Sequence, residues 1–159
     1  MKLSEHLDLS EVTRSESAKR NGISNMPTEA HIANFKLLAE KVFQPIREHF
    51  RCPIIISSGY RSKELNAVIK GSSSTSDHCF GRAIDIDMDG TSISNNEVFD
   101  FIRKNLKFKQ LIAEFPIGGK LSWVHVSYDP NNLKNEILVA KKVNGKTVYI
   151  PYKSDKDLA

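Results

Sequence analysis

The stretch SDHCFGRAID, residues 76–85, carries the strongest signal in this chain, because it places a histidine and an aspartate on either side of a glycine turn. The sequence then alternates apolar and acidic residues over Ile84–Asp87, which on a strand buries both isoleucines and directs both carboxylates to the other face. A second histidine, His125, lies in the apolar segment SWVH at 122–125. Two histidines and one carboxylate are ligands suited to a tetrahedral zinc site that keeps one position open for water.

Periodic apolar residues and capping signals predict helices over residues 13–22, 27–50, 62–69 and 94–106. Thr13 and Ser94 each stand three residues before a glutamate, which is the spacing of a capping box. Pro45 lies inside the second helix and should interrupt it, since proline removes a backbone donor. The N-terminal third of the chain, residues 1–50, is therefore expected to be helical.

Short apolar runs predict strands over residues 53–57, 111–115 and 123–127. Two further runs, 137–143 and 147–150, flank Asn144-Gly145, which is the strongest short signal for a β-hairpin. We expect residues 70–76 to form a flexible connection within the domain. These elements divide the chain into a helical part (1–50), a core (53–128) and a C-terminal hairpin (136–151).

Three segments resemble the zinc D-alanyl-D-alanine carboxypeptidase family, which also contains phage L-alanyl-D-glutamate endopeptidases and shares its fold with hedgehog-type domains. They are Ser-Gly-Tyr-Arg-Ser at 58–62, Ser-x-His-x-x-Gly-Arg-Ala-x-Asp at 76–85 and Trp-x-His at 123–125. The resemblance implies one small α+β zinc peptidase domain, residues 1–159, with an antiparallel sheet flanked by helices. It also implies that His78, Asp85 and His125 bind Zn²⁺.

The same matching suggests roles for three further residues. It implies that Arg61 contacts substrate, where its planar fork could grip a carboxylate or stabilise a developing oxyanion; otherwise Arg61 is a surface residue in a turn. Ser76 could hydrogen-bond substrate, or only cap a turn. Trp123 could form a wall of the site, or belong to the core.

The general base is where the sequence departs from a common family pattern, because Ser122 stands where many members carry an acidic residue. We predict that Glu114 replaces it. If the strands 111–115 and 123–127 pair so that Glu114 faces Trp123, then Glu114 and His125 share one face of the sheet. A connection with an odd number of residues would put Glu114 on the other face, where it would be an exposed carboxylate. An apolar neighbour such as Trp123 would raise the pKa of Glu114 towards the range useful for acid–base catalysis.

Other polar residues near the motif receive weaker expectations. Asp87 could orient a ligand histidine or be solvated, and Asp77 and Asp129 are less well placed alternatives for the base. Cys79 is expected to be a small buried residue rather than a ligand, and together with Cys52 it makes no disulfide framework.

Size and composition fit one soluble domain, which we expect to be a monomer. The chain has 159 residues, 40% of them hydrophobic and 26% charged, with a formal charge of +4. Basic runs interleaved with aromatic residues are absent, which argues against nucleic-acid binding. The N-terminus lacks the apolar core of a signal peptide, and no apolar run reaches membrane-spanning length.

We therefore expect a zinc metallopeptidase that hydrolyses an amide bond in bacterial peptidoglycan stem peptides. It would be a D-Ala-D-Ala carboxypeptidase or an endolysin-type endopeptidase, synthesised in the cytoplasm and acting on the cell wall or from a phage particle. The alternative is a non-catalytic zinc-binding module that recognises peptidoglycan or a protein partner, which the serine at position 122 keeps open. A nucleic-acid-associated protein would rest on charge alone.

Overall fold

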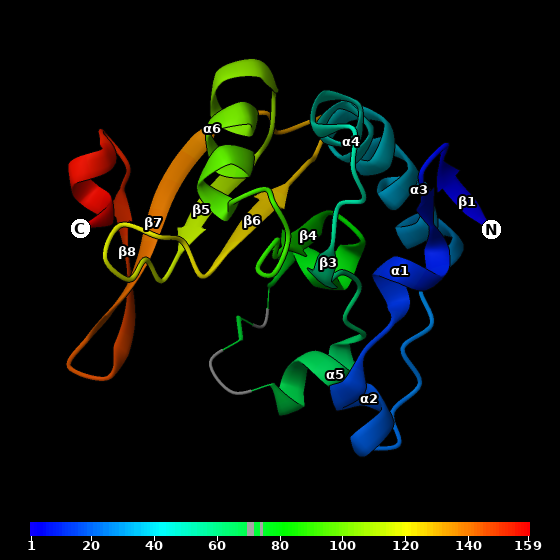
Figure 1. Cartoon of the computed structure of the whole chain (residues 1–159). Helices are drawn as coiled ribbons and strands as arrows, with labels where there is room; N and C mark the ends of the chain where they lie inside the picture. Colours follow the sequence, from blue (N-terminus) through cyan, green and yellow to red (C-terminus); the bar gives the residue numbers. More distant parts are fainter. Residues whose placement is uncertain (70–71, 74) are drawn as a thin grey trace.

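The computed structural model describes residues 1–69, 72–73 and 75–159 (Figure 1). Residues 70, 71 and 74 of the connection predicted over 70–76 lie outside the described residues. Within the described part of the chain, no helix is both long and apolar enough to cross a membrane.

A mixed six-stranded sheet with the order β3-β4-β6-β5-β7-β8 forms the centre of the fold (Figure 1). Its strands are β3 (Ile56–Ser58), β4 (Ala83–Ile86), β5 (Gln110–Glu114), β6 (Trp123–Ser127), β7 (Glu136–Val143) and β8 (Lys146–Pro151). The predicted α+β fold with a helix-flanked sheet is confirmed. Neighbouring strands are antiparallel except β5 and β7. That pair is parallel because the connection after β6 takes the chain past β5 to its other edge, which makes the sheet mixed rather than purely antiparallel.

The helical segments lie before, between and after these strands. They are α1 (Leu9–Thr13), α2 (Glu16–Arg20), α3 (Glu29–Leu38), the π-helical η1 (Ala39–Phe43), α4 (Gln44–Phe50), α5 (Lys63–Val68), the 3₁₀ turn η2 (Asp77–Phe80), α6 (Asn95–Asn105) and the 3₁₀ turn η3 (Asp155–Leu158). A separate two-stranded sheet, β1 (Lys2–Ser4) with β2 (Leu7–Asp8), precedes α1.

The first predicted helix begins at a different residue from the one expected. Asp8 and Glu11 form a capping box that starts α1, and this helix already ends at Thr13. Ser15, not Thr13, caps α2 by accepting a hydrogen bond from the backbone of Ala18. The prediction was wrong because a stronger cap upstream uses Thr13 as the last residue of another helix.

The long helix predicted over 27–50 is confirmed, together with its interruption. Thr28 caps α3, and the π-helical turn η1 separates α3 from α4 immediately before Pro45. Proline has no N–H, and its ring collides with the carbonyl four residues back in a regular helix, so a wider turn relieves both problems.

The predicted strand over 53–57 is displaced towards its C-terminal end. The structure has β3 at Ile56–Ser58, at the edge of the sheet, where it pairs with β4 through an irregular register. Ile54 and Ile56 are buried while Ile55 is 41% exposed, so the apolar run covers one face rather than filling a central strand. The hairpin around Asn144-Gly145 is as predicted, with both turn residues at positive φ.

The two faces of the sheet have different surroundings. One face carries Ile84, Leu111 and Val126 into the main hydrophobic core, and α6 packs against β5 and β6 on this side. Residues in alternate positions, including Asp85 and His125, point to the opposite face. The fold thus places Asp85 and His125 side by side on the face of the sheet away from this core.

Candidate metal centre

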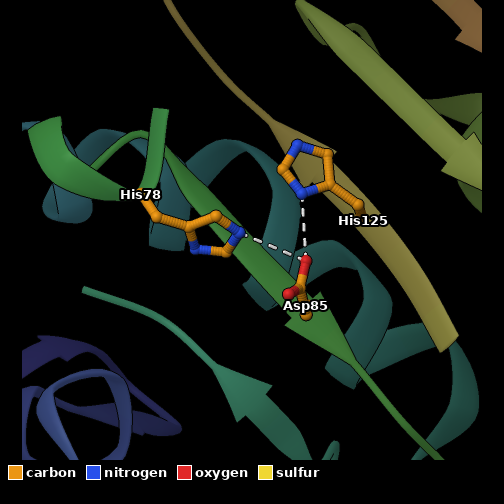
Figure 2. Close-up of side chains that lie close together, drawn as sticks. All are labelled: His78, Asp85 and His125. Carbon is orange, nitrogen blue, oxygen red and sulfur yellow. Dashed lines mark hydrogen bonds and ion pairs between the residues drawn. The ribbon is translucent and has the colours of Figure 1, made fainter. Parts of the chain in front are cut away.

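Three side chains from different elements meet on the polar face of the sheet (Figure 2). Asp85 on β4 is the direct register partner of His125 on β6, and its Oδ1 lies 2.9 Å from Nδ1 of that histidine. His78 on η2 approaches the same oxygen, with its Nε2 at 3.3 Å. All three residues are buried. The residues that the motifs predict as metal ligands are therefore brought together.

The spacing of these atoms fits one small cation. One donor atom from each residue lies within 4.8 Å of the others. In a tetrahedral site with bonds of about 2.0–2.2 Å, neighbouring donors are about 3.3–3.6 Å apart. The separation of 3.3 Å matches this range, and the one of 2.9 Å is somewhat shorter. Two imidazole nitrogens and one carboxylate oxygen are also among the ligand types that zinc prefers. These residues therefore fit a zinc ion.

The backbone of Gly59 sets the orientation of His78. The Nδ1 of this histidine donates to the Gly59 carbonyl at 2.6 Å, which leaves Nε2 with its lone pair directed at Asp85. Burial lowers the pKa of His78, so its imidazole is neutral, as a metal ligand must be. Sequence reasoning missed this partner, because a backbone carbonyl leaves no mark in the residue pattern.

The glycine of the motif, Gly81, turns the chain from η2 into β4. It ends η2 with φ of 70°, a conformation that favours glycine. A Cβ there would also collide with the backbone of His31 and lie 3.0 Å from the Phe35 ring. This turn allows His78 and Asp85 to face one another although six residues separate them.

Replacement of Gly59 by alanine is expected to destabilise the protein and weaken metal binding. A Cβ at this position would lie 2.7 Å from Cα of Val12, so either α1 or the carbonyl that holds His78 must move. We expect a loss of about 1–3 kcal/mol in the free energy of unfolding. Thermal unfolding and zinc titration would measure both effects. Gly90→Ala is the control, since a Cβ there meets no atom within 4 Å and only its positive φ carries a cost. A Gly59→Ala protein with wild-type stability and zinc affinity would contradict this account.

The pKa values of Asp85 and His125 are shifted in opposite directions. Burial alone would raise the pKa of Asp85, but the two adjacent histidines outweigh this effect and lower it far below the usual range. Burial would likewise lower the pKa of His125, but its hydrogen bond to Asp85 and the charge of that carboxylate raise it. Asp85 is thus a permanent anion, and protons compete with a metal for His125 as the pH falls.

Arg61 stands at one side of the cluster. Its Nη2 lies 3.5 Å from Oδ2 of Asp85, its Nε donates to Ser58, and its backbone N–H donates to the carbonyl of His78. Only 16% of its side chain is exposed, so it is not a surface residue in a turn. The guanidinium is held beside the cluster with its position fixed by both side-chain and backbone bonds.

Glu114 lies on the same face as His125, in the register that the sequence predicts. Glu114 pairs with Trp123 and Ile112 with His125, because the strands are joined by a tight turn at Gly118-Gly119. The side chain of Glu114 is buried, and burial raises its pKa to about 7, with Asp85 adding to the rise and His125 and Arg61 opposing it. Ser122 donates to the carbonyl of Phe115 at 2.7 Å, so its hydroxyl is occupied in the turn.

A cavity of about 620 Å³ opens over this face of the sheet. It is lined by all seven residues predicted for the site: Arg61, Ser76, His78, Asp85, Glu114, Trp123 and His125. Ser76 also caps η2 through the backbone N–H of His78, and Trp123 packs against Phe115. The position of Ser76 is therefore compatible with both roles considered for it, a hydrogen bond to substrate and the cap of a turn.

Of the two alternatives considered for Asp87, the structure disfavours a role in orienting a ligand histidine. Asp87 accepts hydrogen bonds from Asn95 and Asp89, so it does not orient a ligand histidine. Asp77 lines the cavity but is bound by Lys109 at 2.9 Å, and Asp129 lies 3.8 Å from Arg82. Cys79 is buried, as predicted, and neither cysteine is bridged.

Comparison with known protein families shows to which family this chain belongs. The family model described as Peptidase M15 matches residues 5–127. A comparison with curated proteins finds no match. M15 is the zinc D-Ala-D-Ala carboxypeptidase family, and at family level its members are zinc metallopeptidases that act on peptidoglycan. The matched segment contains the three predicted ligands, Arg61 and Glu114, and the chain therefore belongs to the M15 peptidases, a family of zinc-dependent metallopeptidases.

Proposed function

We propose that this protein hydrolyses an amide bond in peptidoglycan stem peptides, as a D-Ala-D-Ala carboxypeptidase or as an endolysin-type endopeptidase. The observation that carries the proposal is a buried carboxylate, Glu114, with its pKa raised to about 7 in the same cavity as the His78–Asp85–His125 cluster. Groups that titrate near neutral pH can both accept and return a proton, which amide hydrolysis requires.

His78, Asp85 and His125 would hold the metal. Zinc, when bound, polarises the carbonyl under attack and makes a water molecule more acidic, with a pKa of about 7. The chain's own residues supply the rest. Glu114 in its ionised form takes a proton from the attacking water, and then donates it to the leaving amine. Arg61, beside Asp85, is positioned to hold a substrate carboxylate or the developing oxyanion.

The alternative of a non-catalytic zinc module loses its main support. It rested on the missing acid at position 122, but the pairing of β5 with β6 brings Glu114 to the polar face from the neighbouring strand. A phage lysis enzyme or a phage-particle hydrolase is the biological setting that we propose for this activity.

Chelation of the metal is expected to abolish product formation from peptidoglycan. Purified protein would be incubated with peptidoglycan, with and without a chelator, and products analysed for new amino termini and for free D-alanine. A carboxypeptidase releases D-alanine, whereas an endopeptidase creates amino termini within the stem peptide. Activity should return when zinc is added back. Product formation that is unaffected by chelator, or no product from any peptidoglycan chemotype, would count against the proposed function.

A further inference from the structure

The C-terminal hairpin forms a wall of the metal cavity, although it lies outside the segment matched by the family model. Strand registers place Trp123, Glu114, Ala140 and Tyr149 in one row across β6, β5, β7 and β8. Since side chains alternate along a strand, alternate residues of β7 and β8 share the face that carries Glu114. Four of them line the cavity: Leu138, Lys142, Thr147 and Tyr149.

In this row, one small residue separates Tyr149 from Glu114. Ala140, between them in the row, is fully buried and has only a methyl side chain, so the phenol ring and the carboxylate border the same space. Burial, followed by the negative charges of Glu114 and Asp85, raises the pKa of Tyr149. Tyr149 as a whole remains 52% exposed and lines the cavity, so it is available to a ligand there.

Lys142 contributes a positive charge that the described part of the chain does not neutralise. Its Nζ donates to Thr147 Oγ1 at 3.0 Å and lies 5.5 Å from the centre of the Phe115 ring. No carboxylate among residues 1–69, 72–73 and 75–159 comes within 4.0 Å of this nitrogen. Of the other charged groups that line the cavity, Asp77 is paired with Lys109 and Arg61 with Asp85.

Arg61 and Lys142 lie on opposite sides of the reacting groups. Arg61 follows β3 at one edge of the sheet, whereas Lys142 is on β7. The strands β4, β6 and β5, which carry Asp85, His125 and Glu114, lie between β3 and β7 in the sheet (Figure 1). We propose that Lys142, held by Thr147, binds a carboxylate of the peptide substrate on the side of the reacting bond away from Arg61. Tyr149 covers the peptide beside Glu114. The hairpin thus selects peptides that carry a carboxylate on this side of the reacting bond, in addition to any carboxylate held by Arg61. This inference rests on the proposed function.

Two synthetic stem peptides ending in D-Ala-D-Ala would test this selection. They are identical except that the glutamate carboxylate is free in one and a carboxamide in the other. Calorimetry with zinc-loaded Glu114→Gln protein would measure binding without turnover, and the wild-type background would measure kcat/KM. We expect the free carboxylate to be favoured about tenfold, as for one charge-assisted hydrogen bond. Lys142→Gln should remove this preference, and Lys142→Glu should reverse it.

Lys146→Gln is the matched control, because this exposed lysine lies on the same hairpin but on the opposite face of the sheet. It should leave the preference unchanged. If Lys142→Gln keeps the full preference, or if zinc-loaded Glu114→Gln binds neither peptide, the inference is overturned. If binding depends on Lys142 but wild-type protein cleaves neither peptide, the selection stands and the proposed hydrolysis fails.

Discussion

Asp85→Ala is expected to remove stoichiometric zinc and with it all activity. Asp85 is the residue that both other predicted ligands contact, since its Oδ1 lies 2.9 Å from Nδ1 of His125 and 3.3 Å from Nε2 of His78. Its loss removes the negative charge of the cluster and leaves two imidazoles in a buried site without their common partner. Changes to residues that only support a ligand weaken metal binding about 10–100-fold, so loss of a ligand should exceed this range.

Metal content after dialysis, together with a zinc titration, would measure the effect of Asp85→Ala. Asp87→Ala is the control, because it removes a carboxylate two residues further on, just beyond the end of β4, where its partners are Asn95 and Asp89. The control should retain one zinc per chain, and circular dichroism would establish that both variants fold. Stoichiometric zinc in folded Asp85→Ala protein would exclude the His78–Asp85–His125 site.

The sequence predicts best those parts of the site that depend on the alternation of side chains along a strand. The side chains of β5 and β6 alternate strictly, so one tight turn at Gly118-Gly119 was enough to bring Glu114 to the face of His125. The caps at Ser62 and Ser94 were predictable for the same reason, because the hydroxyl and the amide it accepts from are three residues apart.

Contacts between distant segments were not predictable in this way. The Gly59 carbonyl reaches His78 because β3 lies at the sheet edge and α1 packs close to Gly59, and neither fact can be deduced from the residues around position 59. The hairpin itself was predicted from Asn144-Gly145, but its parallel pairing with β5 was not. Lys142 and Tyr149 therefore enter the cavity without any signal in the motifs.

Glu114→Gln is expected to lower turnover of peptidoglycan peptides by about a hundredfold or more, which is the contribution of a positioned acid–base group. The amide occupies the same volume, so the cavity and zinc content should be unchanged. Ser122→Ala serves as the comparison, because the family resemblance of the sequence places an acid at this position, whereas the Ser122 hydroxyl donates to the Phe115 carbonyl. That variant should keep most of the activity. A Glu114→Gln enzyme with turnover close to wild type would mean that another group is the base.

The pH dependence of turnover is a second test of Glu114, because a purely structural role would not make turnover depend on the ionisation of this residue. A base must be ionised to accept a proton, so kcat/KM should fall as the pH falls through the pKa of Glu114. Burial raises this pKa to about 7, and the positive charge of zinc in the same cavity would lower it, so the acid limb should have its midpoint at or below pH 7. Zinc content measured at each pH separates protonation of Glu114 from loss of the metal through His125. The residual activity of Glu114→Gln should lack this limb wherever zinc stays bound, since glutamine has no proton to gain.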